Sequence, residues 1–399
     1  MPPLILSQEM IKRHSFNDLE VPAKIVIIIF IYAFLAMVTK PYGDPFTVIK
    51  TSQNIGLYGF PFDPVSRSAR APFYYYLLFM ANEHYMLLQS LIAAIDVILL
   101  AVIALRLRIK PSVFSFMLPG LYVLLTRTYV DSLTVTLLSL LVLLSLSSLK
   151  AKTLSPNTYA TILTSFLLVL TRESMLLLPL LALVILVLQQ STMPMRKLLT
   201  FIAPLILGWG LGCLTYYLYV YGVGATTYSS YGLYNVRLED FLVAYTYVFS
   251  SIIPWEVKAK DLSQYLFFIK LPGIAYTYLV FIVRAFIVML ELLISVPFIV
   301  GLIELFRVRR KDLHYATAFS FIVYGIMLAG MLFLVKQPID FFKYICALLP
   351  FTSYLISSGL YFIERRSRIL CLLIKSSYVF MLLFWTLRVF RGYYACIPH

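Results

Sequence analysis

Carboxylates that could accept a proton stand in a polar stretch, residues 39–84, and beyond it. Asp44 and Asp63 lie in this stretch, and Asp131 follows a later apolar run. A carboxylate in such a loop can act as a general base toward a hydroxyl group. Asp44 directly precedes Pro45, and this pair also favours a helix start, with Asp as N-cap and Pro as first residue. The two roles are compatible, because a carboxylate that accepts backbone hydrogen bonds stays ionised.

Basic side chains occupy similar places near the ends of apolar runs. The candidates for binding an anion are Arg70, Arg127, Arg172, Lys336 and Lys343. Charges at the ends of short membrane spans are costly unless they reach the headgroups or line a wet cavity. Phosphate is the natural ligand, because charge-assisted contacts from Arg suit its oxygens. As alternatives, Arg172 pairs with Glu173 or extends to the headgroups, and the two lysines anchor the chain at the interface.

An aromatic run near the end of the polar stretch holds two further candidates, Tyr74 and Tyr75. Exposed tyrosine rings can serve as a platform for a sugar. Tyrosines at the end of a membrane span also form the aromatic belt found at bilayer surfaces. Both interpretations of Tyr74 and Tyr75 stay open at this point.

The composition sets the class of protein that carries these residues. Of 399 residues, 61% are hydrophobic and 13% charged, whereas a soluble domain is about half apolar and about a quarter charged. The apolar runs are long, unlike the short alternating segments of a membrane β-barrel. The net charge of +15 falls mostly in short loops between these runs, which indicates membrane orientation and excludes nucleic acid as the expected partner. We therefore predict an all-α polytopic membrane protein.

The apolar runs predict about eleven transmembrane helices in one domain, residues 1–399. Their expected ranges are 21–38, 85–105, 113–125, 132–149, 158–170, 174–188, 198–220, 274–305, 315–335, 341–363 and 369–390. Two longer polar loops separate them, residues 39–84 and 221–273. The first loop is expected to hold short interfacial helices.

Lysine and arginine divide unevenly between the two sets of short loops. The loops after the second, fourth, sixth, eighth and tenth spans hold 14 of these residues, against 4 in the loops after the third, fifth and ninth. Positively charged loops stay in the cytoplasm. This asymmetry predicts a cytoplasmic N-terminus and places both long loops, 39–84 and 221–273, outside the cell or in the equivalent lumen.

The four cysteines give no sign of a metal centre. Cys213, Cys346, Cys371 and Cys396 are scattered and form no CxxC pair, so they are expected to be small buried residues. No cofactor is required by any motif in the sequence. A divalent metal is possible in principle, but no cluster of ligands supports one.

Three stretches together resemble a known superfamily. Asp44 follows the first span and leads through a short helix to the Gly-Leu-Tyr-Gly turn at residues 56–59 and the Ala-Pro-Phe-Tyr-Tyr-Tyr run at 71–76. Leu-Thr-Arg-Glu at 170–173 ends a middle span, and Phe-Lys-Tyr at 342–344 leads to Leu-Pro at 349–350. This order resembles the GT-C superfamily of integral-membrane glycosyltransferases.

The resemblance implies transfer of a hexose, mannose-like, from a polyprenyl- or dolichyl-phosphate sugar to an acceptor hydroxyl on a glycan, lipid or protein, with inversion. It implies Asp44 as the base, with Asp63 and Asp131 behind it. Arg172, Lys336 and Lys343 would bind the phosphate, followed by Arg70 and Arg127. The phosphate leaves already charged, so no general acid is needed. Pro45 follows Asp44 where a second acid would stand, which leaves metal dependence open.

Two other functions fit a polytopic membrane protein. A transporter or flippase for lipid-linked glycans would show internal repeats and helices broken at mid-membrane, and the sequence shows no clear repeat. A non-catalytic subunit of a membrane complex is the third alternative. Short loops and compact size favour a prokaryotic (archaeal) cell membrane with the site facing outside over the endoplasmic reticulum membrane.

Overall fold

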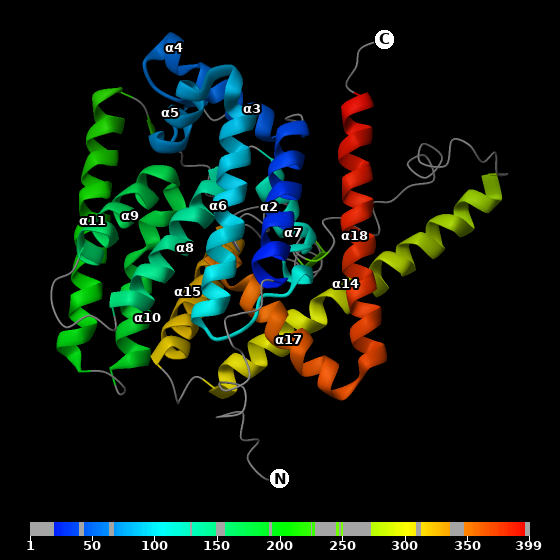
Figure 1. The fold of residues 1–399 in the computed structure, drawn as a ribbon. Helices are drawn as coiled ribbons and strands as arrows, with labels where there is room; N and C mark the ends of the chain where they lie inside the picture. Colours follow the sequence, from blue (N-terminus) through cyan, green and yellow to red (C-terminus); the bar gives the residue numbers. More distant parts are fainter. Residues whose placement is uncertain are drawn as a thin grey trace.

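The chain folds almost entirely into helices (Figure 1). The structure, a computed structural model, describes residues 20–39, 44–63, 68–127, 130–148, 156–190, 194–224, 226–227, 245–246, 249, 273–308, 313–335 and 347–395. The α-helices are α2 Glu20–Val38, α3 Asp44–Gln53, α4 Ile55–Tyr58, α5 Pro72–Ala81, α6 Tyr85–Arg106, α7 Pro119–Thr126, α8 Val130–Ser148, α9 Pro156–Thr171, α10 Pro179–Gln189, α11 Met195–Gly222, α14 Gly273–Val308, α15 Leu313–Val335, α17 Thr352–Arg366 and α18 Arg368–Ala395. Short 3₁₀ turns are η1 Asn82–His84, η2 Val113–Phe116, η3 Glu173–Leu177 and η7 Leu349–Phe351.

Six helical segments in the described part of the chain are long and apolar enough to cross a membrane. They are Pro72–Arg106, Val130–Ser147, Met195–Gly222, Thr277–Arg307, His314–Met331 and Arg368–Leu387. Three shorter apolar helices accompany them, Pro22–Val38, Asn157–Thr171 and Glu173–Gln189. The prediction of an all-α protein with membrane-length apolar helices is confirmed, while the number of crossings and their orientation stay predictions.

Two of the expected spans are broken where proline stands inside them. The run at 113–125 forms η2 and α7, and the run at 174–188 forms η3 and α10. Each second piece begins with a proline, Pro119 or Pro179, at the start of its helix. Proline lacks a backbone N–H and its ring clashes with the preceding turn, so a helix restarts there more easily than it continues. The expected span at 341–363 lies partly outside the described residues, which resume with η7 and α17.

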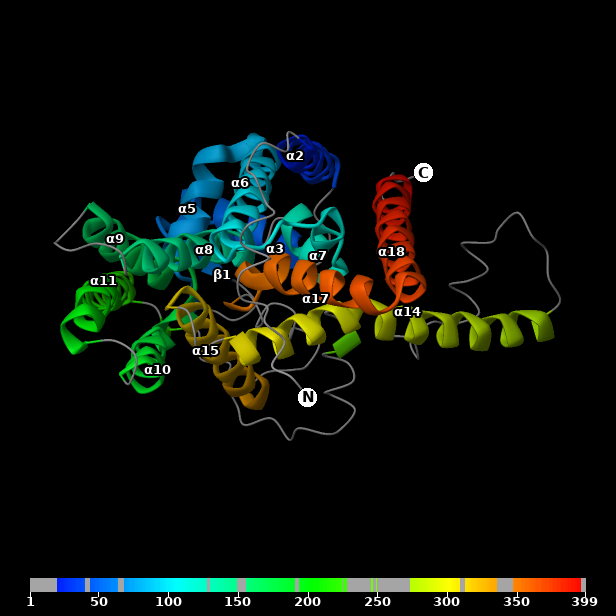
Figure 2. The ribbon, with the colours of Figure 1, turned by 60° about the horizontal axis from the view of Figure 1, so that its bottom comes forward.

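The helices pack closely at a few glycines. α14 lies against α17, and α9 against α11. A Cβ atom at Gly301 or Gly359 would clash with a backbone carbonyl of the facing helix, that of Leu355 or Pro297. Helices in a membrane gain little from the hydrophobic effect, so small residues that let backbones approach are a main source of their association. Figure 2 shows that the first half of α14 extends beyond the other described helices.

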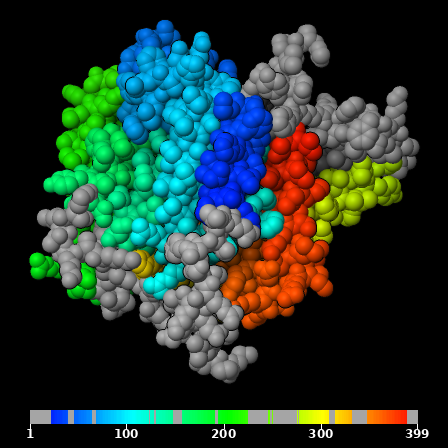
Figure 3. Space-filling model, in the orientation of Figure 1, coloured from blue at the N-terminus to red at the C-terminus, as the bar shows by residue number. Residues whose placement is uncertain are grey.

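The first polar loop forms a small cap at one end of the molecule, which we call the loop end (Figures 1 and 3). It consists of α3, α4 and strands β1 Phe62–Asp63 and β2 Ser68–Ala69. α4 stops at Gly59, whose φ of 77° is left-handed and therefore suits glycine. Asn54 then fixes β1, because its Nδ2 donates a hydrogen bond to the Phe62 carbonyl at 2.7 Å.

A third strand joins the two predicted outer loops. β3 Thr226–Thr227, just after α11, pairs in parallel with β2, and β2 pairs antiparallel with β1. Residues from the stretches 39–84 and 221–273 therefore meet in one small sheet. Thr226 and Thr227, which form β3, therefore lie beside the first loop at the loop end.

Candidate functional site

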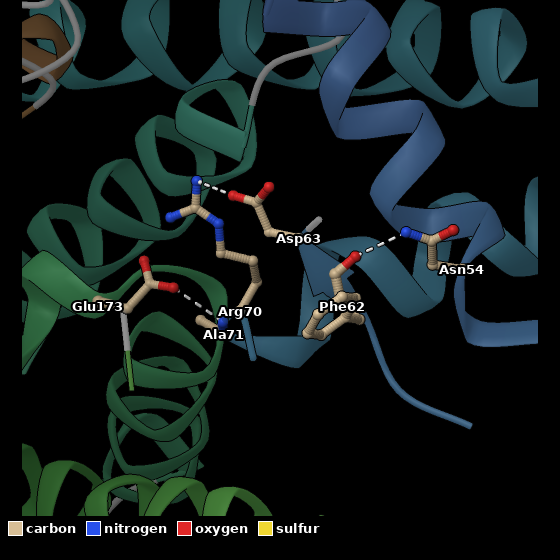
Figure 4. Close-up of polar contacts among 6 residues, drawn as sticks. All are labelled: Asn54, Phe62, Asp63, Arg70, Ala71 and Glu173. Carbon is tan, nitrogen blue, oxygen red and sulfur yellow. Dashed lines mark hydrogen bonds and ion pairs between the residues drawn. The ribbon is translucent and has the colours of Figure 1, made fainter. Parts of the chain in front are cut away.

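Asp63 and Arg70 form an ion pair across the antiparallel strands of the cap (Figure 4). Arg70 Nη2 lies 3.1 Å from Asp63 Oδ2, and the Asp63 side chain is almost wholly buried. The Arg70 backbone N–H also donates to the Pro61 carbonyl at 3.2 Å, which holds the residue beside β1. The hairpin of β1 and β2 thus brings together an acidic and a basic residue of the first loop.

Glu173 ties the end of α9 to the start of α5. It is the first residue of η3, one residue beyond the position that follows α9, and its Oε1 accepts a hydrogen bond of 3.0 Å from the Ala71 backbone N–H. Figure 4 shows the Glu173 carboxylate reaching toward Ala71 on one side of the Arg70 side chain, with Asp63 on the other. This hydrogen bond therefore holds the C-terminal end of α9 against the first loop.

Arg172 forms a buried ion pair with Asp131. Asp131 lies in the first turn of α8, and Arg172 lies between α9 and η3. Only 10% of the Arg172 side chain and 6% of the Asp131 side chain are exposed. Arg172 therefore pairs with Asp131, and not with Glu173 as one of the interpretations had it. Glu173, its neighbour in sequence, binds Ala71 through a hydrogen bond instead.

Tyr75 of α5 lies near the arginines of both ion pairs. Its hydroxyl is within electrostatic range of Arg70, Asp63, Arg172 and Glu173. The ion pairs from the hairpin and from the ends of α8 and α9 therefore belong to one charged cluster. Its members, which we call the loop-end cluster, are Asp63, Arg70, Tyr75, Asp131, Arg172 and Glu173.

Burial limits what the two predicted aromatic residues can do. Tyr74 and Tyr75 are both buried, and Tyr74 belongs to the main hydrophobic core. Neither ring forms an exposed belt or an open sugar platform in this conformation. Tyr74 instead donates a hydrogen bond of 3.1 Å to Gln89 Oε1. Tyr75 stays a candidate because of its place among the charged groups.

Gln89 of α6 forms hydrogen bonds with residues of α5, α7 and α8. Its Nε2 donates to the Leu125 carbonyl at 2.9 Å, and its Oε1 accepts from Tyr74 and from Ser132 Oγ at 3.4 Å. These contacts join α5, the end of α7 and the start of α8. Gln89 was not among the residues predicted from the sequence, although a lone glutamine near the start of an apolar span is a detectable signal.

Asp96 was also missed. It lies halfway along α6, fully buried, and its Oδ1 accepts a hydrogen bond of 2.7 Å from Thr136 Oγ1 of α8. A single acid inside the apolar run 85–105 is the signal that could have found it, because ionisable residues within spans are costly and usually functional.

The remaining predicted site residues do not belong to the loop-end cluster, and three of them lie wholly or partly outside the described part of the structure. Asp44 is the first residue of α3, and its side chain lies outside the described part of the structure. Lys336 and Lys343 fall outside the described residues. Arg127 follows α7 directly, is half-buried, and forms no ion pair with any residue that the structure describes. The three acids of the loop-end cluster outnumber its two arginines, so a bound phosphate would need further cations such as Arg127.

No grouping of three or more His, Cys, Asp or Glu residues suited to a metal ion occurs within the described ranges. No family model, curated protein or solved structure matches this chain. The geometry of the loop-end cluster is therefore the main basis for a functional conclusion.

Proposed function

We propose that this protein is a membrane glycosyltransferase. It transfers a hexose from a polyprenyl- or dolichyl-phosphate sugar to an acceptor hydroxyl, with inversion, on the extracytoplasmic side. The observation that carries the proposal is the loop-end cluster. It brings the hairpin of the first loop to the ends of two membrane helices, where the headgroup of a lipid-linked donor would lie.

The reaction needs a base for the acceptor and cations for the leaving group. The acceptor oxygen bonds to the anomeric carbon as the bond from that carbon to the phosphate oxygen breaks. The phosphate departs with the electron pair, and the acceptor proton goes to a carboxylate. Developing negative charge on the leaving phosphate is stabilised by positioned cations.

Asp44 is the best candidate for the base, because the other two carboxylates are committed elsewhere. Asp63 and Asp131 are buried and each forms an ion pair with an arginine. These pairs suit positioning, since a buried, paired carboxylate is poorly placed to receive an incoming acceptor. Asp44 begins the helix of the cap, where the backbone around Pro45 is constrained.

The phosphate would be held by arginines at the helix ends. Arg172 is oriented by Asp131, and Arg127 ends α7 without an ion partner among the described residues. Gln89 bonds to the Leu125 carbonyl and to Ser132, one residue from Asp131, so it fixes the spacing of the two segments. Lys336 and Lys343 are proposed as further phosphate ligands on the sequence resemblance alone.

The test is sugar transfer by the purified protein in lipid nanodiscs. A radiolabelled short-chain polyprenyl-phosphate hexose serves as donor, with membrane glycolipids, oligosaccharides and peptides as acceptors. Asp44→Asn keeps the size of the side chain and its ability to cap a helix, because Asn caps about as well as Asp, but it removes the proton acceptor. A general base contributes about 10²- to 10⁴-fold, so transfer should fall by that factor while donor binding is retained.

Glu83→Gln is the matched control, because Glu83 is an exposed carboxylate of the same loop. Asp63→Asn should reduce transfer less than Asp44→Asn does. If Asp44→Asn transfers at the wild-type rate, Asp44 is not the base. If the wild-type protein transfers no hexose from any lipid-linked donor, the proposed function is wrong.

Transport of a lipid-linked glycan is the second candidate, and Asp96 is the observation that favours it. Transporters place ionisable residues near the middle of the bilayer, and Asp96 lies halfway along the apolar helix α6. α6 is nevertheless continuous from Tyr85 to Arg106, whereas transporter sites usually lie at broken helices. Movement of a fluorescent lipid-linked sugar across proteoliposomes, lost in Asp96→Asn and unchanged in Asp44→Asn, would favour transport over transfer.

A further inference from the structure

The end of α11 builds a second, smaller hydrophobic core beside the loop-end cluster. Tyr216 and Val220 are buried there against Ala69 and Ala71 of the first loop and Leu170 of α9. Tyr219 packs on the edge of the same core, with its ring 6.3 Å from that of Tyr216. This packing fixes the aromatic end of α11 next to the segment that carries Glu173.

Among the described residues, the hydroxyl of Tyr219 has no hydrogen-bond partner that would stabilise the fold. Its ring is half-exposed, but its hydroxyl is shielded from water and forms no hydrogen bond with a described residue. The hydroxyl is within electrostatic range of Tyr76 and Glu173. A buried hydroxyl without a partner costs stability, so such groups in native proteins call for an explanation. A ligand that completes the hydrogen bond would explain it.

Glu173 offers the matching acceptor. Its Oε1 is used by the Ala71 N–H, whereas its other oxygen accepts no hydrogen bond from a described residue. The residue is only partly buried, so solutes can approach it. Tyr76, which is within electrostatic range of Tyr219, donates one exposed hydrogen bond of 2.9 Å from its hydroxyl to the Gly59 carbonyl. A ligand can replace the Gly59 carbonyl as the hydrogen-bond partner of the Tyr76 hydroxyl.

We propose that Glu173, Tyr219 and Tyr76 form a subsite for a pyranose ring of the acceptor. A carboxylate accepts hydrogen bonds from neighbouring sugar hydroxyls, and a tyrosine offers both a hydroxyl and an apolar ring face. A carboxylate disfavours a phosphate at the same place, and the arginines of the phosphate site belong to the ends of α7 and α9. This inference rests on the proposed function, because it assigns the acceptor to the α11 side of the loop-end cluster.

The experiment measures sugar binding without a donor. Methyl glycosides of mannose, glucose and galactose are titrated into the full-length protein in nanodiscs, with binding followed by saturation-transfer NMR. At least one glycoside should bind the wild-type protein. Tyr219→Phe and Glu173→Gln should each weaken that binding by about tenfold, the loss typical of one or two hydrogen bonds. Tyr217→Phe is the matched control, because Tyr217 lies on α11 but is 66% exposed and stacks on Tyr221 instead.

The melting temperature of the sugar-free protein separates a ligand site from a structural role. Tyr219→Phe removes an unsatisfied hydroxyl, so its melting temperature should equal or exceed that of the wild type. Glu173→Gln keeps an oxygen for the Ala71 N–H and should also remain folded. If no glycoside binds the wild-type protein, or if Tyr219→Phe binds as tightly as the wild type, the subsite is wrong. Sugar binding without any transfer would overturn the proposed function and leave the subsite in place.

Discussion

The buried pair of Arg172 and Asp131 allows a direct test of the site's construction. Asp131→Asn or Arg172→Gln removes one side of an ion pair in which only 10% of the Arg172 side chain and 6% of the Asp131 side chain are exposed. Removing one member of a buried pair typically costs about 3–5 kcal/mol, because the remaining charge stays desolvated and loses this close counter-charge. Removing both replaces the ions with neutral amides. The double variant should therefore lose much less stability than the sum of the two single variants.

The assay is a double-mutant cycle on the free energy of unfolding in mixed micelles, monitored by circular dichroism. The exposed pair of Lys375 and Glu364 is the control, with 27% and 54% of the side chains exposed and a separation of 3.3 Å. Its single variants Lys375→Gln and Glu364→Gln should cost less than about 1 kcal/mol. If the variants of Arg172 and Asp131 cost no more than these, or if their effects simply add, the buried pair does not hold the ends of α8 and α9 together.

Two further predictions address the scaffold. Gly359→Ala places a Cβ against the Pro297 carbonyl and should destabilise the packing of α14 on α17 by about 1–3 kcal/mol, the usual cost of overpacking, in the same unfolding assay. Gly330→Ala, which has open space around its Cβ, should be neutral; equal effects would refute the close approach. Single cysteines at the exposed positions Gln53 and Lys110 should react with a membrane-impermeant maleimide from opposite sides, Gln53 from outside in intact cells. Labelling of Lys110→Cys from outside would reverse the predicted orientation.

The helical membrane class and most helix boundaries follow from the sequence. Long apolar runs with few charges leave only membrane-length helices as a stable outcome, because each backbone group must be bonded within its own segment. The expected ranges 132–149, 198–220 and 315–335 correspond closely to α8, α11 and α15. Proline marks the breaks that separate η2 from α7 and η3 from α10, and that local signal was present in the sequence.

The candidate site was only partly predictable. The acids and bases near helix ends could be named, because a charge at the end of a span is conspicuous against apolar neighbours. The partner of each charged residue could not be named from the sequence. Asp131 and Arg172 belong to different helices, and whether they meet depends on how α8 and α9 rotate and how deep each one lies. Proximity in sequence pointed Arg172 toward Glu173 as an alternative, whereas the fold directs Glu173 to Ala71.

Tertiary structure also decided which polar groups are buried. Tyr74 and Tyr75 are of the residue type typical of an interfacial belt, but in the folded α5 both side chains are buried. The pairing of β2 with β3 joins residues 68–69 of the first loop to residues 226–227, which follow α11. Sequence determines that a segment is an apolar helix, since this depends on its own residues. Which face is covered, and by what, depends on contacts between segments far apart in the chain, so only the folded structure settles it.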